Sequence, residues 1–205
     1  MSEGTKTKST AAKRPITPKV PAKAKAASAK PAAAKPAATK TRPAATKKQP
    51  KPTKLSMEGA KFIAKFEGFR GKMYNDAAGH CTIGFGHLVH LGPTTGREAP
   101  EFCKGITRER GLALLQQDAG KACSAIKSNV KVPLNQHQFD ALTSFVFNVG
   151  GEAFRQSTLL KKLNAGEYAA VPSELNRWNK AGGRPLEGLT RRRKAEGALF
   201  MHGKY

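Results

Sequence analysis

Two carboxylates and a hydroxyl lie within one short stretch of this chain, at spacings that suit the cleavage of a glycosidic bond. Glu67 falls at the end of a helical pattern, Asp76 follows in a turn, and Thr82 comes next on a glycine-flanked strand. Two carboxyl groups presented from different elements across a cleft are the minimum equipment for glycoside hydrolysis. The Thr82 hydroxyl adds a group that would hold a water molecule.

The helix that would carry Glu67 is predicted from apolar residues at helical spacing between Phe62 and Phe69, with Ser56 as its N-cap. Gly68 then breaks the pattern. Glu67 lies at the edge of the apolar face and is expected to be half-buried. Partial desolvation there would disfavour the carboxylate and keep a proton available for transfer.

A small antiparallel sheet is predicted over residues 72–89, where the pattern alternates and residues 75–80 supply a tight turn. Neighbours on a strand point to opposite faces, so a Thr82 that faces the cleft turns Cys81 and Ile83 away from it. That orientation argues against Cys81 as a nucleophile. Asp76, in its glycine- and asparagine-rich turn, is expected to stay ionised.

Composition divides the chain near residue 54. Of 37 Lys and Arg and 14 Asp and Glu in 205 residues, the first 54 hold 15 cations, one acid and 8 of the 13 prolines, with no aromatic residue. Such a segment cannot bury enough surface to offset chain entropy, so residues 1–54 are predicted to be a disordered basic tail. Residues 55–205 are of ordinary size for one compact domain.

The rest of the domain is predicted to be helical. Thr107 would cap a long helix with an apolar stripe from Leu112 to Ile126, and Asn135 would cap the next helix, which ends at Gly150. Further helices are expected at 157–165, about 168–178 and 189–201, with a glycine-rich turn at 181–186. The predicted class is therefore α+β, mainly α: a small sheet lobe, a long connecting helix and an all-helical lobe.

Neither a metal nor a cofactor is expected. The three cysteines, Cys81, Cys103 and Cys123, lack metal-type spacing, and reduced structural thiols are the favoured interpretation. Cys81 next to His80 hints at a metal-binding pair, but a single His-Cys dipeptide is a weak signal. No run of 18 apolar residues is present, and the basic N-terminus lacks the apolar core of a secretory signal, so we expect a cytoplasmic protein without an integral membrane segment.

The stretch EGFRGKMYNDAAGHCTIGFGH (67–87) strongly resembles the phage-type, T4-like lysozymes, whose catalytic pattern has this glutamate, aspartate and threonine at the same spacing. The second half is similar to the same family in several separated motifs, in the right order: QFDALTSFVFNVG (138–150), RWN (177–179) and GLTRRR (188–193). The resemblance covers about residues 55–200 and leaves the tail outside it. It implies a two-lobed, lysozyme-like fold.

The resemblance implies a muramidase that hydrolyses the β-1,4 bond between N-acetylmuramic acid and N-acetylglucosamine in peptidoglycan. Glu67 would be the general acid, Asp76 would activate water or stabilise the transition state, and Thr82 would hold the water. Inversion would follow if the carboxyl groups are roughly 6.5–9.5 Å apart, and retention if they are about 5–5.5 Å apart. Taken singly, each residue is better explained structurally: Glu67 as a helix-end carboxylate paired with Arg70, Asp76 as a simple turn residue and Thr82 as a strand former. Together with the TIGFGH motif, the three favour catalysis.

Other positions take their roles from the same resemblance. Leu88, Phe147 and Ser157 map onto substrate-groove positions, although core packing is an equal interpretation of Phe147. His87 would meet Asp118 in a structural ion pair that joins the two lobes at their base. The protein is expected to act as a monomer.

Two basic segments remain. The tail would bind anionic envelope polymers such as lipopolysaccharide, or serve only to solubilise the chain. The run from Arg191 to Lys194 would contact phosphates or peptide-stem carboxylates, although a solvated helix face is the more favoured interpretation.

The leading hypothesis is a phage endolysin that stays in the host cytoplasm until holin-type release and then acts on the wall in the periplasm. A lytic transglycosylase also needs a catalytic glutamate, but Asp76 and Thr82 favour water as the acceptor. The histone-like tail keeps open a nucleic-acid- or wall-binding protein on a lysozyme scaffold, which the intact triad opposes.

Overall fold

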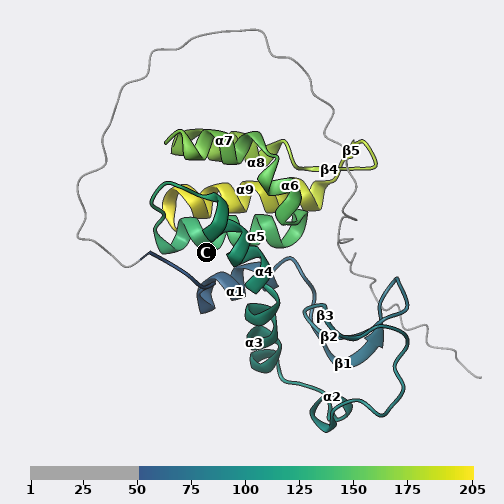
Figure 1. Cartoon of the computed structure of the whole chain (residues 1–205). Coiled ribbons are helices and arrows are strands. Elements are labelled where there is room, and N and C mark those ends of the chain that lie inside the picture. The colour runs from purple at the N-terminus through teal and green to yellow at the C-terminus, as the bar shows by residue number, and fades with distance from the viewer. Residues whose placement is uncertain (1–50) are drawn as a thin grey trace, which may run out of the picture.

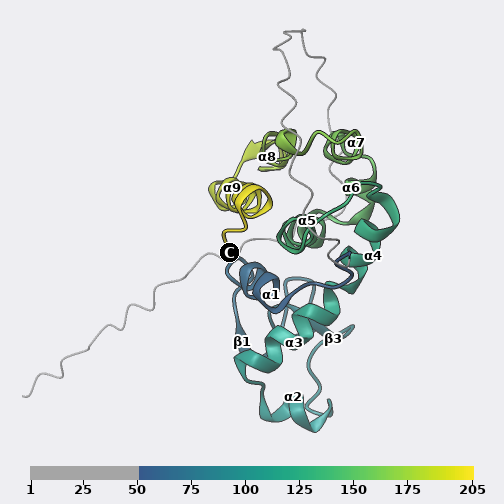
Figure 2. The same ribbon diagram turned by 90° about the vertical axis from the view of Figure 1, so that its left-hand side faces the viewer.

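A three-stranded sheet and a group of helices occupy opposite ends of the computed structural model, which describes residues 51–205 (Figure 1). The antiparallel sheet has the order β1-β2-β3, formed by β1 (Arg70–Asn75), β2 (Cys81–Gly84) and β3 (His87–His90). Figure 2 shows α1 (Met57–Ala64) between the end of the molecule that holds the sheet, together with α3 (Arg108–Asp118), and the end that holds most of the helices. The α+β, mainly helical class expected from the sequence is confirmed.

Seven further α-helices and one 3₁₀ turn complete the helical part of residues 51–205. They are α2 (Pro100–Lys104), α4 (Gly120–Asn129), α5 (Gln136–Val149), α6 (Gly151–Arg155), α7 (Thr158–Asn164), η1 (Tyr168–Ala170), α8 (Val171–Asn176) and α9 (Glu187–His202). A two-stranded hairpin, β4 (Lys180–Ala181) and β5 (Arg184–Pro185), occupies the glycine-rich turn expected at 181–186. The short helices α2 and α6 and this hairpin are the elements that the sequence pattern did not predict.

The long connecting helix expected after Thr107 is present as two segments. Thr107 caps α3 as predicted, its side chain accepting from Arg110 N, and α3 ends at Asp118. Ala119 is both the C-cap of α3 and the N-cap of α4, and its backbone angles stay in the helical region. Gly120 then begins α4. The apolar stripe continues through both segments because Leu115, Ala119 and Ile126 are all buried in the same core.

The helical lobe is organised around α5, whose start the sequence identifies well. Asn135 accepts from Gln138 N, and the Gln138 side chain in turn accepts from Asn135 N, so a capping box satisfies two backbone donors. Phe139, Leu142 and Phe145 of α5 are almost fully buried. α9 packs along α5 on one side and against α8 on the other, so the C-terminal helix lies between these two helices (Figure 1).

A buried carboxylate fixes the start of α1, the helix that leads to Glu67. Asp140 of α5 is fully buried and accepts from Ser56 N, Ser56 Oγ, Gln136 Nε2 and the Tyr205 hydroxyl at 2.5–3.1 Å. Burial and this hydrogen bond raise the pKa of Tyr205 to about 12. The beginning of the domain, α5 and the C-terminal residue therefore meet at one point, and the C-terminus lies beside α1 in both views (Figures 1 and 2).

The basic tail is predicted to be disordered over residues 1–54. Residues 1–50 of it lie outside the described residues, so only residues 51–54 can be compared with the structure. Residues 51–54 have neither helix nor strand, and the Lys54 carbonyl accepts from Gln136 Nε2. The division at residue 54 stays a prediction. Across residues 51–205, none of the helices is both long and apolar enough to cross a membrane.

Candidate active site

Glu67 lies three residues beyond the end of α1, in the turn that leads into β1. Its side chain is 22% exposed, which agrees with the half-buried position expected from the sequence. Its carboxylate accepts from Arg192 Nη1 at 2.7 Å, and Arg192 belongs to α9, 125 positions later. The alternative pairing with Arg70 is wrong, since the Arg70 guanidinium instead lies 4.3 Å above the centre of the Tyr74 ring.

Arg192 is itself held by a buried ionic network on α9. Its Nε lies 3.2 Å from Glu196 Oε1, and its Nη2 donates to the Ser144 carbonyl at 3.3 Å. Glu196 is fully buried and also accepts from Ser144 Oγ at 2.7 Å and from Arg193 Nη2 at 3.0 Å. The Glu67 carboxyl group is therefore oriented by a guanidinium that packing and its contacts with Glu196 and the Ser144 carbonyl fix in place.

The basic run from Arg191 to Lys194 does not form one surface patch. Arg192 is 3% exposed and Arg193 is fully buried, whereas Arg191 and Lys194 are exposed. Burial lowers the pKa of Arg193 to about 10, so its side chain remains a cation at neutral pH. Both expectations for this run, a phosphate-binding end and a solvated face, are wrong for its two central residues, because Glu196 compensates their charge inside the lobe.

Asp76 begins the tight turn between β1 and β2. Its Oδ1 accepts from Ala78 N at 2.8 Å and from His80 N at 2.9 Å, and its own backbone N–H donates to the His80 carbonyl. A side chain that bonds the backbone two and four residues ahead fixes the loop conformation and its own rotamer together. Asp76 as a whole residue is half-exposed.

Thr82 and Asp76 both donate a hydrogen bond to the His80 carbonyl. The Thr82 hydroxyl donates to it at 3.1 Å, and the Asp76 donor is the backbone N–H. Thr82 is 3% exposed and pairs with Tyr74 on β1 and Leu88 on β3. With its proton donated inward, the hydroxyl oxygen keeps lone pairs to accept a hydrogen bond from water.

Tyr74 is a residue that the sequence analysis missed. It lies on β1, two positions before Asp76. Burial is the main cause that raises the pKa of Tyr74, while the charge of Arg70 lowers it. The charges of both Asp76 and Glu67 add to this increase, which places the phenol within electrostatic range of both carboxylates. Alternation along β1 was the available signal, because it puts Tyr74 and Asp76 on the same side of the strand.

A small cavity opens beside Glu67. Its volume is about 40 Å³, and it is lined by Glu67, Phe85, Gly86, Phe147 and Asn148. That is room for a few ordered water molecules. Gly86 has a φ of +88°, which only glycine adopts readily, and a Cβ there would meet no atom within 4 Å. The cavity brings together Glu67 and Phe147, one from each lobe.

The other two predicted groove residues lie in different surroundings. Leu88 is 47% exposed on β3, where its side chain presents apolar surface directly opposite Thr82 in the strand register. Ser157 is 4% exposed and serves as the N-cap of α7, accepting from Leu160 N and donating to the Phe154 carbonyl. A sugar contact through the Ser157 hydroxyl would therefore have to replace one of those bonds.

The contact predicted between His87 and Asp118 is present. His87 Nδ1 lies 3.0 Å from each carboxylate oxygen of Asp118. The histidine begins β3 and the aspartate ends α3, so the contact fastens the sheet to the connecting helix. It uses both carboxylate oxygens of Asp118, which fits the structural role that was predicted for the pair.

Comparison with known proteins gives a consistent result. Residues 64–196 match the family model described as phage lysozyme. The chain is 42% identical over 150 residues to the endolysin of Acyrthosiphon pisum secondary endosymbiont phage 1, covering 71% of this chain and 97% of that protein. It is 42% identical over 147 residues to the endolysin of Salmonella phage P22, covering 72% and 97%. A crystal structure of a P22 lysozyme mutant superposes with a TM-score of 0.64 at 38% identity, covering 72% of this chain and 98% of that one.

Proposed function

The chain belongs to the phage lysozyme family, and we propose that Glu67, Asp76 and Thr82 carry out its reaction. Its function is that of an endolysin, a lysozyme-type glycoside hydrolase that acts on the peptidoglycan of the bacterial wall. The observation that carries the residue assignment is the pairing of Glu67 with a buried guanidinium on one side of the cavity, while Asp76 and Thr82 share the His80 carbonyl in the sheet lobe.

In this proposal Glu67 protonates the glycosidic oxygen as the bond to the anomeric carbon breaks. Asp76 takes a proton from a water molecule, and the resulting hydroxide adds to that carbon, so each cleavage consumes one water. Thr82 accepts a hydrogen bond from the same water and aligns it. All three groups come from one chain, so a monomer supplies the whole set.

The substrate groove is also a proposal. Phe147 lies beside Glu67 in the cavity and would offer an apolar plate to one face of a sugar ring. Leu88, exposed on β3, would line the groove on the sheet side. Ser157 would contribute chiefly by fixing α7, since its hydroxyl is already used in the helix cap.

Substitutions in the sheet lobe test the assignment of the water-activating pair. Asp76→Asn and Thr82→Ala are each expected to lower kcat on purified peptidoglycan by about 10²-fold or more, because each removes a group that positions or deprotonates water. Thr82→Ser keeps the hydroxyl and should retain most of the activity. Initial rates of reducing-end release measure all three variants. Full activity in Thr82→Ala would rule out the proposed water-holding role.

The basic tail is proposed to bind anionic polymers of the cell envelope, including lipopolysaccharide. Its composition supports this, with 15 Lys and Arg and a single acid in residues 1–54. Spaced cations form many weak contacts with a polyanion, and these contacts weaken as salt screens them. The tail would thereby raise the local concentration of enzyme at the wall without entering the catalytic step.

Deletion of residues 1–54 is therefore expected to leave hydrolysis of purified peptidoglycan nearly unchanged. The same deletion should weaken the lysis, at low salt, of whole cells whose outer membrane has been permeabilised. The deficit should shrink as salt is added, because the lost term is electrostatic. The matched control is a tail of equal length with every Lys and Arg replaced by Gln, which should behave as the deletion does. Equal lysis by all three proteins at low salt would exclude the proposal.

The route to the wall is the last part of the proposal. The enzyme would collect in the host cytoplasm and reach the periplasm through a holin-type pore. Expression of the chain alone should then leave host cells intact, and rapid lysis under those conditions would exclude this route.

A further inference from the structure

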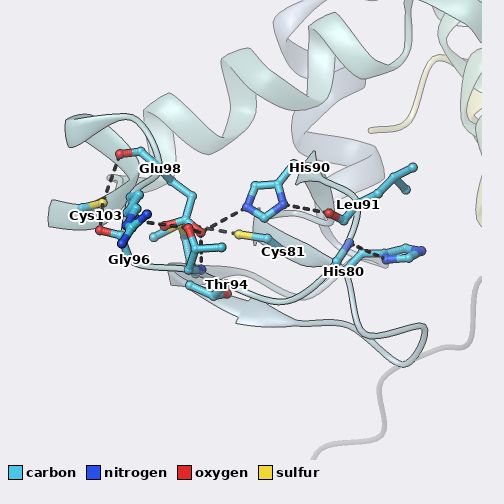
Figure 3. Close-up of polar contacts among 12 residues, drawn as sticks. His80, Cys81, His90, Leu91, Thr94, Gly96, Glu98 and Cys103 are labelled. Atoms are coloured by element: carbon cyan, nitrogen blue, oxygen red, sulfur yellow. Dashed lines mark hydrogen bonds and ion pairs between the residues drawn. The ribbon is translucent and has the colours of Figure 1, made fainter.

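Three side chains of metal-ligand type meet at the outer edge of the sheet lobe, away from the cavity beside Glu67. They are Cys81 of β2, His90 at the end of β3, and Glu98 in the loop that leads to α2 (Figure 3). One ligand atom from each lies within 4.8 Å of the other two. We propose that Cys81, His90 and Glu98 bind a Zn²⁺ ion, which pins the loop of residues 91–99 to the sheet.

The fold itself brings the three residues together. Cys81 and His90 are direct cross-strand partners in the β2–β3 register, at a point where the register shifts between Cys81 and Thr82. The Cys81 backbone N–H donates to the Gly92 carbonyl, so the loop turns back over the strand immediately after β3. Glu98 then reaches His90 Nε2 at 3.1 Å.

Glu98 is the strongest indication that this cluster binds a cation. Its side chain is only 1% exposed. Oε1 is satisfied by Thr95 N at 2.6 Å, by Thr95 Oγ1 at 3.1 Å and by His90, but Oε2 is buried and has no hydrogen-bond partner. A buried carboxylate oxygen without a partner is costly, and a cation bound to it would remove that cost.

His90 is oriented as a metal-binding histidine should be. Its Nδ1 lies 3.0 Å from the Leu91 carbonyl, which fixes that nitrogen as a donor and directs Nε2 at Glu98. A backbone carbonyl on the far nitrogen is a common support for a metal-bound imidazole. The same ring therefore contacts the Leu91 carbonyl through one nitrogen and the Glu98 carboxylate through the other.

The donor set selects the metal. One thiol, one imidazole and one carboxylate suit Zn²⁺, with a water completing four-coordinate geometry. Tetrahedral ligands at about 2.0–2.3 Å from zinc lie roughly 3.3–3.8 Å apart, so the present cluster needs to contract by about an ångström. Zinc binds the thiolate and the neutral imidazole, so any proton on Cys81 Sγ or His90 Nε2 passes to solvent on binding. Thiolate and carboxylate then balance the charge of the ion.

The neighbouring residues separate this cluster from the pair that the sequence suggested. His80 precedes Cys81 in the chain, yet its Nδ1 accepts from Gly92 N at 3.1 Å, and the ring lies apart from the other three side chains (Figure 3). Cys103 is exposed, and its sulfur contacts the Glu98 and Gly96 carbonyls instead of the cluster. The ion has access from solvent, since the His90 side chain is 35% exposed.

Cobalt and zinc titrations of the untagged, full-length, metal-stripped protein test the proposal. One equivalent of Co²⁺ should give a thiolate-to-cobalt charge-transfer band with the visible bands of a tetrahedral site, and one equivalent of Zn²⁺ should remove both. Zn²⁺ should also raise Tm by several degrees. His90→Gln, at a part-exposed position that tolerates change, should bind at least about 100-fold more weakly and lose the Tm shift.

Cys103→Ser is the matched control and should behave as the wild type in both measurements, while Cys81→Ser should lose the charge-transfer band. The proposal is overturned if the wild type shows no band and no Tm shift with stoichiometric metal. It is equally overturned if the band persists in His90→Gln, or if it disappears in Cys103→Ser. None of these readouts depends on enzymatic activity, so failure here leaves the hydrolase assignment untouched.

Discussion

Glu67→Gln is expected to lower kcat on peptidoglycan by about 10²–10⁴-fold, the usual contribution of a general acid, with little change in stability. The amide has nearly the shape of the carboxyl group, and its oxygen can still accept from Arg192 Nη1, which lies 2.7 Å from Glu67 Oε1. It has no proton of suitable acidity for the leaving oxygen. The loss should therefore appear in kcat, while binding to peptidoglycan and Tm remain close to the wild type.

Glu58→Gln provides the matched control for this change. Glu58 lies in the first turn of α1, the helix that leads to Glu67, and pairs with Lys61 on an exposed face. It should keep wild-type kcat, because an exposed pair outside the cavity contributes nothing to the reaction. If Glu67→Gln retained more than about a tenth of the wild-type kcat, the role of Glu67 as general acid would be wrong.

Glu196→Ala is expected to cause the largest loss of stability, about 3–5 kcal/mol in the free energy of unfolding. The change leaves Arg192 and Arg193 buried without the carboxylate that compensates them, and it removes the acceptor of Ser144 Oγ. Arg192 would lose one of its anchors, so activity should also fall through the misplacement of Glu67. Urea denaturation followed by circular dichroism measures the first effect.

An exposed ion pair provides the comparison for the loss of stability expected in Glu196→Ala. Glu152→Gln breaks an ion pair with Arg155 whose two side chains are each 61% exposed, and it should change stability little. The double variant Arg193→Met, Glu196→Leu should recover much of the loss, because it removes two buried charges together. A free energy of unfolding in Glu196→Ala within about 1 kcal/mol of the wild type would contradict the network's role.

The elements of the fold were largely predictable because local signals agreed with the packing. Ser56, Thr107 and Asn135 are the observed N-caps of α1, α3 and α5, and each accepts the backbone hydrogen bond that its residue type favours. The antiparallel sheet followed from alternation and the turn at 75–80. The elements that were missed, α2, α6 and the β4–β5 hairpin, are two to five residues long, which is too short for a periodic pattern.

The surroundings of the site were less predictable because they depend on contacts distant in the sequence. Glu67 and Arg192 are separated by 125 positions, and adjacent arginines gave no sign that both face the core. The available signal was Glu196, which lies four and three residues after Arg192 and Arg193, the spacing of a salt bridge on one helix face. Likewise, Cys81 lies opposite His90 across a strand pair, a contact that the order of residues along the chain does not indicate.

The central claim is that this chain hydrolyses the glycosidic bond with water that Asp76 and Thr82 align. The most direct test is mass spectrometry of muropeptides released from purified peptidoglycan by the wild-type protein in heavy-oxygen water. The account predicts reducing N-acetylmuramic acid ends that each carry one heavy oxygen atom from the solvent. Anhydro-sugar ends without solvent oxygen would contradict it, since they would identify a lytic transglycosylase that uses no water.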